Sequence, residues 1–358
     1  MSGGVALVVA VVAATFVNLN EYAIVPGQAQ NVAPLIGAPA KLTHHHQGAI
    51  LLTDVDLVQV RAVDYLFYRL DHNADLVPTA VLTGQASVAT YDEQGVIDMD
   101  TARQAATFAA LRSLGYPVHA VPAGVIVYQL EQTSAAAGIL SVGDVITALD
   151  RHPVTTLASL SKLESALHPG DPVTIVAHRI GVTRTRTVRL VTGAYHLVGS
   201  GSAATSSCLR AGRAGHVAAG SKPLACLGIY PEQLFATTAL PFSLNINSEG
   251  IIGPSAGLAF ALGIVEKLDT KDLTAGMKVA ATGTISIDGS VGDVGGVAQK
   301  TVAVERAGAK VFFVPTPELA TARAHASGGL KVYAVASLDQ AVADLEHLGG
   351  AIAPSTRS

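Results

Sequence analysis

Ser255 is the residue of this sequence best placed to act as a nucleophile. It lies in Gly253-Pro-Ser-Ala-Gly257, and an apolar pattern at helical spacing, Ala256–Leu268, follows directly. The first N–H groups of a helix have no partner within the helix, so they can bind the negative charge that develops on a carbonyl oxygen under attack. A serine hydroxyl is a weak nucleophile at neutral pH and needs a neighbouring base. The rest of the sequence must therefore supply that base.

Histidine is one candidate for the base. Only His325 and His347 follow Ser255, so a serine–aspartate–histidine order would use, for example, Asp339 with His347. Gly-x-Ser-x-Gly is also the nucleophile pattern of α/β-hydrolases. That fold needs a long parallel sheet on both sides of the serine, whereas about 100 residues follow Ser255. Proline directly before the nucleophile also fits that turn poorly, so the sequence disfavours histidine.

Lysine is the better candidate. Lys300 lies in Gly295-Gly-Val-Ala-Gln-Lys-Thr301, on a predicted helix of mostly apolar residues. A lysine base must be neutral, so its pKa must fall from about 10.4 toward ~7–8. Burial among apolar side chains lowers the pKa because desolvation penalises the ammonium form. Thr282, at the end of the predicted strand Lys278–Thr282, can orient the amine by accepting its hydrogen bond. Gln299, in place of glycine before Lys300, argues against a phosphate-binding loop.

Several motifs in register resemble the proteolytic domain of Lon-type serine proteases. They are Gly253-Pro-Ser-Ala-Gly257, Thr282-Gly-Thr-Ile-x-Ile-Asp-Gly-x-Val-Gly292, Gly295-Gly-Val-x-x-Lys300, Ala307-Gly308-Ala309 and Phe313-Val-Pro315. The resemblance implies Ser255 as nucleophile, Lys300 as general base and Thr282 as the orienting partner of the lysine. It also implies that Gly253, Pro254 and Ala256 shape the substrate and oxyanion pocket.

Two positions depart from the Lon pattern. Ile252 stands three residues before Ser255, where many Lon proteases have aspartate, and Thr284 stands two residues after Thr282, where many have glutamate. Both change the polarity of the predicted pocket and leave the Ser255–Lys300 pair in place.

A second segment resembles a bacterial-type PDZ domain. It contains Ser134-Ala-Ala-Ala-Gly-Ile-Leu-x-Val-Gly-Asp-Val-Ile146 and Pro169-Gly170-Asp171 within a run of short predicted strands and turns. The resemblance implies that an extended peptide pairs with an exposed sheet edge. By position, the strand start Gly124, Val125, Ile126 and Val127 would be the peptide-binding segment. It lacks a Gly-Leu-Gly-Phe run, which puts capture of a C-terminal carboxylate in doubt, and a spacer or oligomer contact is the alternative role.

The order of elements predicts an α+β fold with the PDZ-like domain inserted into the Lon-like lobe. The predicted helix Asp100–Leu114 and strand Ala49–Val60 overlap two segments, Met99-Asp-Thr-x-x-Gln-Ala-Ala106 and Gly48–Val55, that resemble elements Lon domains carry before the serine. We therefore expect an apolar anchor and linker over 1–40, the first part of the protease lobe over 41–117, and the PDZ-like domain over 118–194. The catalytic domain would cover 195–350 and a tail 351–358.

Composition limits the partners. Apolar residues make up 49% of the 358 residues, charged residues 14%, and the formal net charge is −4. Nucleic acid is an unlikely partner for such a chain, because its lysines and arginines are scattered. No P-loop motif occurs, so no ATP and no other cofactor are expected. The tract His44–His46 has no accompanying carboxylate pattern, so no metal site is expected either.

The N-terminus and the two cysteines both bear on location. Val5–Val17 is an apolar run with no preceding Lys or Arg, and as a helix it would be about 20 Å long, short of the ~30 Å membrane core. We favour a single membrane anchor with an extracytoplasmic catalytic domain, and a buried helix or strand is the alternative. In an exported chain, Cys208 and Cys226 are candidates for a disulfide, with two free thiols as the alternative.

The sequence therefore predicts an ATP-independent serine endopeptidase acting on unfolded or extended polypeptides. By analogy with Lon-type domains, it would assemble into rings of six. Two alternatives stay open: a PDZ binding module on a catalytically idle Lon-like scaffold, and a dyad that cuts only its own chain.

Overall fold

The computed structural model describes residues 14–84, 86–198, 205–210, 224–237, 240–248 and 250–353. The chain forms two compact units. The first unit combines Met1–Tyr91, Asp98–His119 and Ala239–Ser358, and the second combines Asp92–Ile97 with Ala120–Thr238. The predicted boundary at 194 thus differs from the structure, in which the second unit continues through Thr238. The predicted α+β class is confirmed.

The first unit is built on a six-stranded mixed sheet in the order β19-β18-β15-β3-β1-β4. The long strands β1 (Asn18–Asn31) and β3 (Ala49–Arg61) are antiparallel, and β4 (Asp75–Pro78) pairs with β1. On the other side of β3, three strands run parallel to it: β15 (Lys278–Ala281), β18 (Val311–Pro315) and β19 (Lys331–Val335).

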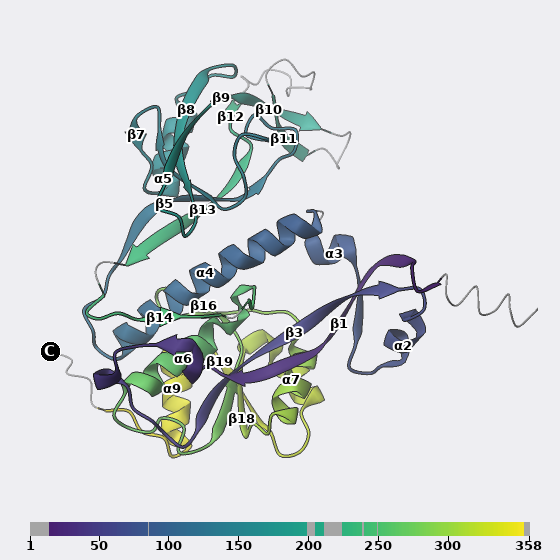
Figure 1. Ribbon diagram of the computed structural model, residues 1–358, viewed down its shortest axis with the longest axis vertical. Helices are drawn as coiled ribbons and strands as arrows, with labels where there is room; N and C mark the ends of the chain where they lie inside the picture. The colour runs from purple at the N-terminus through teal and green to yellow at the C-terminus, as the bar shows by residue number, and fades with distance from the viewer. Residues whose placement is uncertain are drawn as a thin grey trace, which may run out of the picture. The chain divides into compact units, whose positions relative to one another are not determined.

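Helices pack against this sheet. α7 (Val297–Arg306) lies against β1 and β3, while α6 (Gly257–Leu268) contacts β3 and α9 (Leu338–His347), as Figure 1 allows the reader to follow. The shorter helices are α2 (Tyr65–Leu70), α3 (Thr79–Thr83) and α8 (Leu319–His325), and α4 (Val88–Ser113) is the longest. All but one residue of α6 is buried, with Lys267 the exception, so this helix forms much of the core.

Short 3₁₀ turns and two-residue ladders complete the first unit. The 3₁₀ turns are η1 (Ala33–Leu35), η2 (Ala40–Leu42), η4 (Pro254–Ala256) and η5 (Thr316–Glu318). The ladders pair β2 (Ile36–Gly37) with β14 (Asn245–Ile246), and β16 (Thr284–Ile285) with β17 (Val291–Gly292).

The second unit has a five-strand sheet path in the order β13-β5-β6-β8-β9. Its strands are β5 (Ala120–Leu130), β6 (Asp144–Leu149), β8 (Pro172–Arg179), β9 (Thr185–Val191) and β13 (Ile229–Thr237), with β7 (His152–Pro153) pairing with β6. Helix α5 (Leu157–Ser165) starts with a capping box at Thr156 and Ser159 and packs on β5 and β13. A small sheet joins β10 (Gly193–Val198), β11 (Thr205–Leu209) and β12 (Ala225–Cys226).

Two predictions about the N-terminal part are wrong. The predicted linker contains β1, because pairing with β3 and β4 overrides the turn signals of Pro26 and Gly27. A register shift between Pro26 and Ala29 absorbs both residues. The helix predicted from Asp100 begins at Val88, where the Ser87 side chain accepts a hydrogen bond from the Thr90 N–H.

The predicted anchor, Val5–Val17, lies mostly outside the described residues, of which it includes only the last four. Among the described residues, no helix combines the length and apolar character needed to cross a membrane.

Candidate active site

Ser255 sits in a tight turn that only small residues allow. It is the middle residue of η4, which leads directly into α6. Gly253 has φ of 86°, a left-handed conformation that favours glycine. A Cβ at Gly257 would lie 2.8 Å from Cγ2 and 3.0 Å from the backbone nitrogen of Ile285. The small residues around the serine thus let the turn pack closely on β16 while Ser255 itself stays partly exposed.

Lys300 points into the protein from the second turn of α7. Its side chain is 2% exposed, and its Nζ donates a hydrogen bond to the Oγ1 of Thr282 at 3.2 Å. Thr282 is fully buried just after β15, where its N–H donates to the carbonyl of Phe313. Its position is therefore fixed by the sheet.

Thr282 also connects the lysine to the serine turn. Its Oγ1 donates to the backbone carbonyl of Ser255 at 3.2 Å, and the N–H of Gly283 donates to the same carbonyl at 2.9 Å. The threonine hydroxyl thus accepts from Lys300 and donates to the Ser255 main chain. The structure brings Ser255, Thr282 and Lys300 into one hydrogen-bonded group, although the sequence separates the first and last by 45 positions.

Burial sets the protonation of Lys300. Desolvation lowers the pKa of the Lys300 ammonium from 10.5 to about 8, while the negative charges of Asp54 and then Glu318 oppose this fall. Neither carboxylate was found from the sequence. Asp54 lies in β3 and Glu318 ends η5, and no motif connects these positions with Lys300. At a pKa near 8, an appreciable fraction of the lysine is neutral at physiological pH.

The predicted pocket residues Gly253, Pro254 and Ala256 flank Ser255 in the same turn. The N–H of Gly257 closes the turn on the carbonyl of Pro254, and the N–H of Leu258 donates to the carbonyl of Gly283. Ile252, which stands where many Lon domains carry aspartate, is 41% exposed next to this turn. The structure therefore places an apolar side chain at the rim of the candidate site.

The histidine alternative finds no support in the structure. The Nδ1 atoms of His325 and His347 contact carbonyls of their own helices, at Thr321 and Ala343. Asp339 accepts a hydrogen bond from Ser113 instead of facing an imidazole. A serine–aspartate–histidine group is therefore not assembled around Ser255.

The predicted peptide-binding segment of the second unit is not a free edge. Gly124, Val125, Ile126 and Val127 lie in β5, which pairs with β13 on one side and β6 on the other. The three apolar residues are fully buried. The prediction of an accessible edge at these residues is wrong, because β13, a strand from much later in the sequence, pairs with β5 and forms the edge of the sheet on this side.

The start of β13 is held from two directions. Cys208 and Cys226 form a disulfide, and Cys226 lies three residues before β13. On the α5 side, the Glu164 Oε1 accepts a hydrogen bond from the N–H of Leu227 at 2.9 Å. At the other end of α5, the N–H of Leu157 donates to the Gln233 side chain at 3.1 Å. Helix α5 therefore runs antiparallel beside the edge strand.

Comparison with known proteins decides what these two units are. The family model of the Lon protease (S16) C-terminal proteolytic domain matches residues 249–346, which include Ser255, Thr282 and Lys300. The model of the PDZ domain matches residues 103–190. The chain contains a Lon-type proteolytic domain and a PDZ domain. The Lon-type domain supports a serine peptidase, and the three residues described above are its candidate catalytic group.

Curated Lon proteases are similar to a limited part of the chain. The chain is 38% identical over 63 residues to the Lon protease of Mesomycoplasma hyopneumoniae, which is 18% of this chain and 7% of that protein. It is 33% identical over 91 residues to the Lon protease of Lachnoclostridium phytofermentans, covering 25% of this chain and 11% of the relative. The chain thus spans about a tenth or less of the length of these relatives.

Solved PDZ domains resemble part of the chain. The PDZ domain of an SdrC-like protein from Listeria innocua covers 30% of this chain and 92% of its own, at 19% identity and a TM-score of 0.22. That of an SdrC-like protein from Listeria monocytogenes covers 19% of this chain and 70% of its own, at 22% identity and a TM-score of 0.18. Scores this low carry no argument beyond the PDZ family match.

Proposed function

We propose that this protein is a serine endopeptidase in which Ser255 is the nucleophile and Lys300 the general base. The observation that carries the proposal is the hydrogen bond from the Lys300 Nζ to Thr282, whose hydroxyl is bonded to the main chain of Ser255. A buried lysine is costly to a fold, and a scaffold without catalytic function has no need of one.

The proposed reaction follows the usual course of serine acyl transfer. The neutral amine of Lys300 uses one hydrogen to bond Thr282, which leaves its lone pair free to accept the Ser255 proton. The Ser255 Oγ then forms a bond to the peptide carbonyl carbon, and backbone N–H groups at the Gly253–Ala256 turn stabilise the oxyanion. Lys300 returns the proton to the leaving amine, which yields an ester on Ser255. After the leaving amine has departed, the neutral amine of Lys300 activates a water molecule. The attack of this water on the ester releases the acid product and regenerates the serine.

We propose that the PDZ domain presents substrates along β13, the last strand on its side of the sheet, in place of the segment inferred from the sequence. An extended peptide can pair with such an edge while α5 lines its other side. At the start of this edge, the Glu164 carboxylate already accepts a hydrogen bond from the N–H of Leu227. Burial raises the pKa of the Glu164 carboxyl. Internal segments of unfolded chains, which carry no terminal charge, therefore suit this edge better than C-termini do.

Three further proposals extend the sequence expectations. The endopeptidase acts on unfolded or extended polypeptides without ATP, assembles into a ring of its own copies, and is tethered to a membrane by its apolar N-terminal segment with the catalytic unit outside the cytoplasm. Casein hydrolysis with and without ATP tests the first, and light scattering of the purified protein tests the second. Extraction of membranes at high pH, which retains proteins with a spanning helix, tests the third.

The central experiment compares wild type with Ser255→Ala. We expect wild type to degrade unfolded casein and to become labelled at Ser255 by a serine-directed phosphonate, and the variant to do neither. Labelling without casein turnover, together with one fixed cut in the protein's own chain, would support self-processing alone. Neither labelling nor turnover, with peptide binding retained, would support the idle scaffold.

A further inference from the structure

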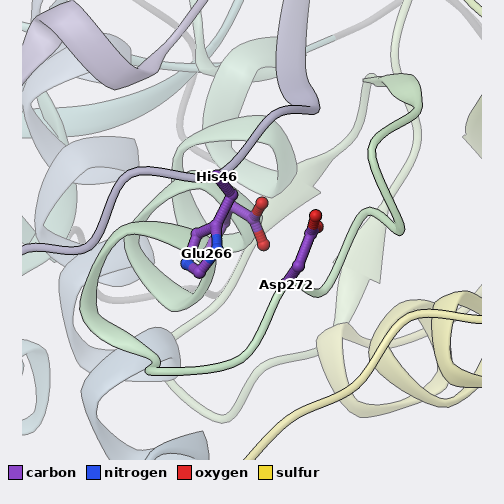
Figure 2. Close-up of side chains that lie close together, drawn as sticks. All are labelled: His46, Glu266 and Asp272. Atoms are coloured by element: carbon purple, nitrogen blue, oxygen red, sulfur yellow. The ribbon is translucent and has the colours of Figure 1, made fainter.

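Three side chains with metal-binding chemistry meet at the end of α6 that is remote from Ser255. They are His46 from the segment before β3, Glu266 from the last turn of α6, and Asp272 from the loop between α6 and β15 (Figure 2). One ligand atom from each of the three lies within 4.8 Å of the other two. The sequence gives no hint of this group, since 220 positions separate His46 from Glu266.

The surroundings hold each side chain in place. Glu266 accepts a hydrogen bond from the N–H of Leu273 at 2.8 Å, and the hydroxyl of Thr274 lies between the two carboxylates, 3.2 Å from Glu266 Oε1 and 2.7 Å from Asp272 Oδ1. Asp272 accepts from the N–H groups of Thr274 and Gly276. Among the contacts of the described residues, no hydrogen bond or ion pair joins His46, Glu266 and Asp272 to one another. The three side chains are therefore held in place by their surroundings and not by bonds to one another.

One ring nitrogen of His46 has a backbone partner. Its Nε2 lies 3.2 Å from the carbonyl oxygen of Asp269. A carbonyl only accepts, so Nε2 donates in this contact and Nδ1 is the nitrogen left to bind an ion. A backbone carbonyl that fixes the tautomer in this way is the usual outer support of a metal-bound imidazole.

The charges at this place favour a cation. Glu266 and Asp272 place two carboxylates beside each other at the end of α6, with His46 as the third potential ligand. Lys267 lines the same region, but its Nζ donates to the carbonyl of Ala33. A divalent ion bound between the two carboxylates would relieve their repulsion.

The three ligand atoms lie within 4.8 Å of one another, so binding of one ion would draw them closer together. Nitrogen and oxygen ligands bind Zn²⁺ at about 2.0–2.2 Å, so ligands of one tetrahedral ion lie roughly 3.5 Å apart. The group borders a cavity of about 320 Å³, lined among others by Gly48, Ile50 and Glu266, which gives an ion and its water a route to the site.

We propose that His46, Glu266 and Asp272 form a binding site for a divalent transition-metal ion of the Zn²⁺ type, with water completing the coordination. One imidazole and two carboxylates suit Zn²⁺ or Mn²⁺ better than Mg²⁺, which prefers oxygen ligands. The ion would join the segment before β3 to the end of α6, the helix whose start follows Ser255. Its role is therefore structural, and it does not depend on the proposed peptidase activity.

Calorimetry and thermal unfolding of the full chain test this site. After dialysis against EDTA, we expect ZnCl₂ to bind at one site per chain and to raise the melting temperature by several degrees, while equimolar MgCl₂ leaves it unchanged. His46→Gln and Asp272→Asn should each weaken Zn²⁺ binding at least tenfold. His45→Ala removes a neighbouring, exposed imidazole at the same cavity and should leave the affinity within a factor of two.

Several results would overturn the proposal. They are the absence of binding heat and melting shift at millimolar ZnCl₂, an equal shift with MgCl₂, or Zn²⁺ binding that His45→Ala weakens as much as His46→Gln does. The last result would assign the metal to the exposed histidine tract. Far-UV circular dichroism establishes that each variant is folded. If Asp272→Asn fails to fold, the His46→Gln variant alone decides. Unlike Asp272, His46 accepts no hydrogen bond from a backbone N–H of the described residues, so its replacement removes none of these bonds.

Discussion

The Lys300 Nζ lies 3.2 Å from the Oγ1 of Thr282, and both residues are buried. The same hydroxyl donates to the carbonyl of Ser255. One threonine thus links the position of the proposed base to the turn that carries the proposed nucleophile.

Replacing Thr282 by valine keeps the shape of the side chain and removes its hydroxyl. Lys300 then loses its orienting acceptor, so casein turnover should fall about 10- to 100-fold, part of the ~10²–10⁴ that a positioned base contributes. Thr282→Ser keeps the hydroxyl and should retain most of the activity. Equal rates for Thr282→Val and wild type would show that the hydroxyl has no part in catalysis.

Lys300 lowers the stability of the fold at neutral pH. Its pKa falls from 10.5 to about 8 on folding, which corresponds to about 3 kcal/mol at pH 7. Between pH 8 and 10.5 the unfolded chain binds more protons than the folded one, so stability rises with pH across this window and the penalty is complete below it. Lys300→Met should therefore be inactive and more stable than wild type at pH 7.

Denaturant titrations of Lys300→Met and wild type check this account. The difference in unfolding free energy should approach 3 kcal/mol near pH 7 and shrink as the pH rises through 10.5, above which the lysine is neutral in both states. If Lys300→Met is less stable than wild type at pH 7, or if the difference is independent of pH, burial of the Lys300 ammonium does not destabilise the fold.

The carboxylates near Lys300 should set the pH at which the enzyme becomes active. Asp54 and Glu318 hold the pKa of Lys300 above the value that burial alone would give. Asp54→Asn and Glu318→Gln remove this charge, so the lysine should lose its proton at lower pH and the rising limb of the activity profile should move in the acid direction.

A matched control separates charge at the site from charge in general. Glu305, like Glu318, accepts a hydrogen bond from a backbone N–H, in its case that of Ser327. Glu305→Gln should leave the pH profile in place. If the rising limb of the activity profile stays at the same pH in Asp54→Asn and Glu318→Gln, neither carboxylate influences the pKa of Lys300.

Glu164 should make the PDZ edge discriminate against C-termini. Its carboxylate accepts the hydrogen bond from the N–H of Leu227, so the terminal carboxylate of an incoming peptide would meet a like charge there. Fluorescence anisotropy should show that a labelled extended peptide binds more tightly with an amidated end than with a free acid. Glu164→Gln should remove that difference. Tighter binding of the free acid to wild type would reject this orientation of the substrate.

Much of the candidate site could be predicted from the sequence because its residues lie in short, continuous motifs. The small residues around Ser255 and the apolar helix around Lys300 can each be recognised from neighbouring residues in the sequence. The fold then brings the two together through Thr282. The strand β1 and the edge strand β13 could not be predicted in the same way. Pro26 and Gly27 favour a turn locally, and only pairing with β3 makes them part of a strand.

Long-range placement explains the other omissions. Asp54 and Glu318 act on Lys300 from separate elements, and His46 meets Glu266 across most of the chain. In the sequence the histidine tract has no carboxylates beside it, whereas the end of α6 and the following loop supply two of them. Such groups depend on sheet order and helix packing, and neither is encoded in the spacing of the residues.

The rate at which a serine-directed phosphonate labels Ser255, measured from pH 6 to 10, tests the central claim most directly. If Lys300 is the base, labelling of wild type should rise with pH and reach half its maximum near pH 8, where the lysine becomes neutral. Lys300→Arg, whose guanidinium stays protonated, should not be labelled at any of these pH values. Labelling of Lys300→Arg at the wild-type rate, or a rate independent of pH, would contradict the account.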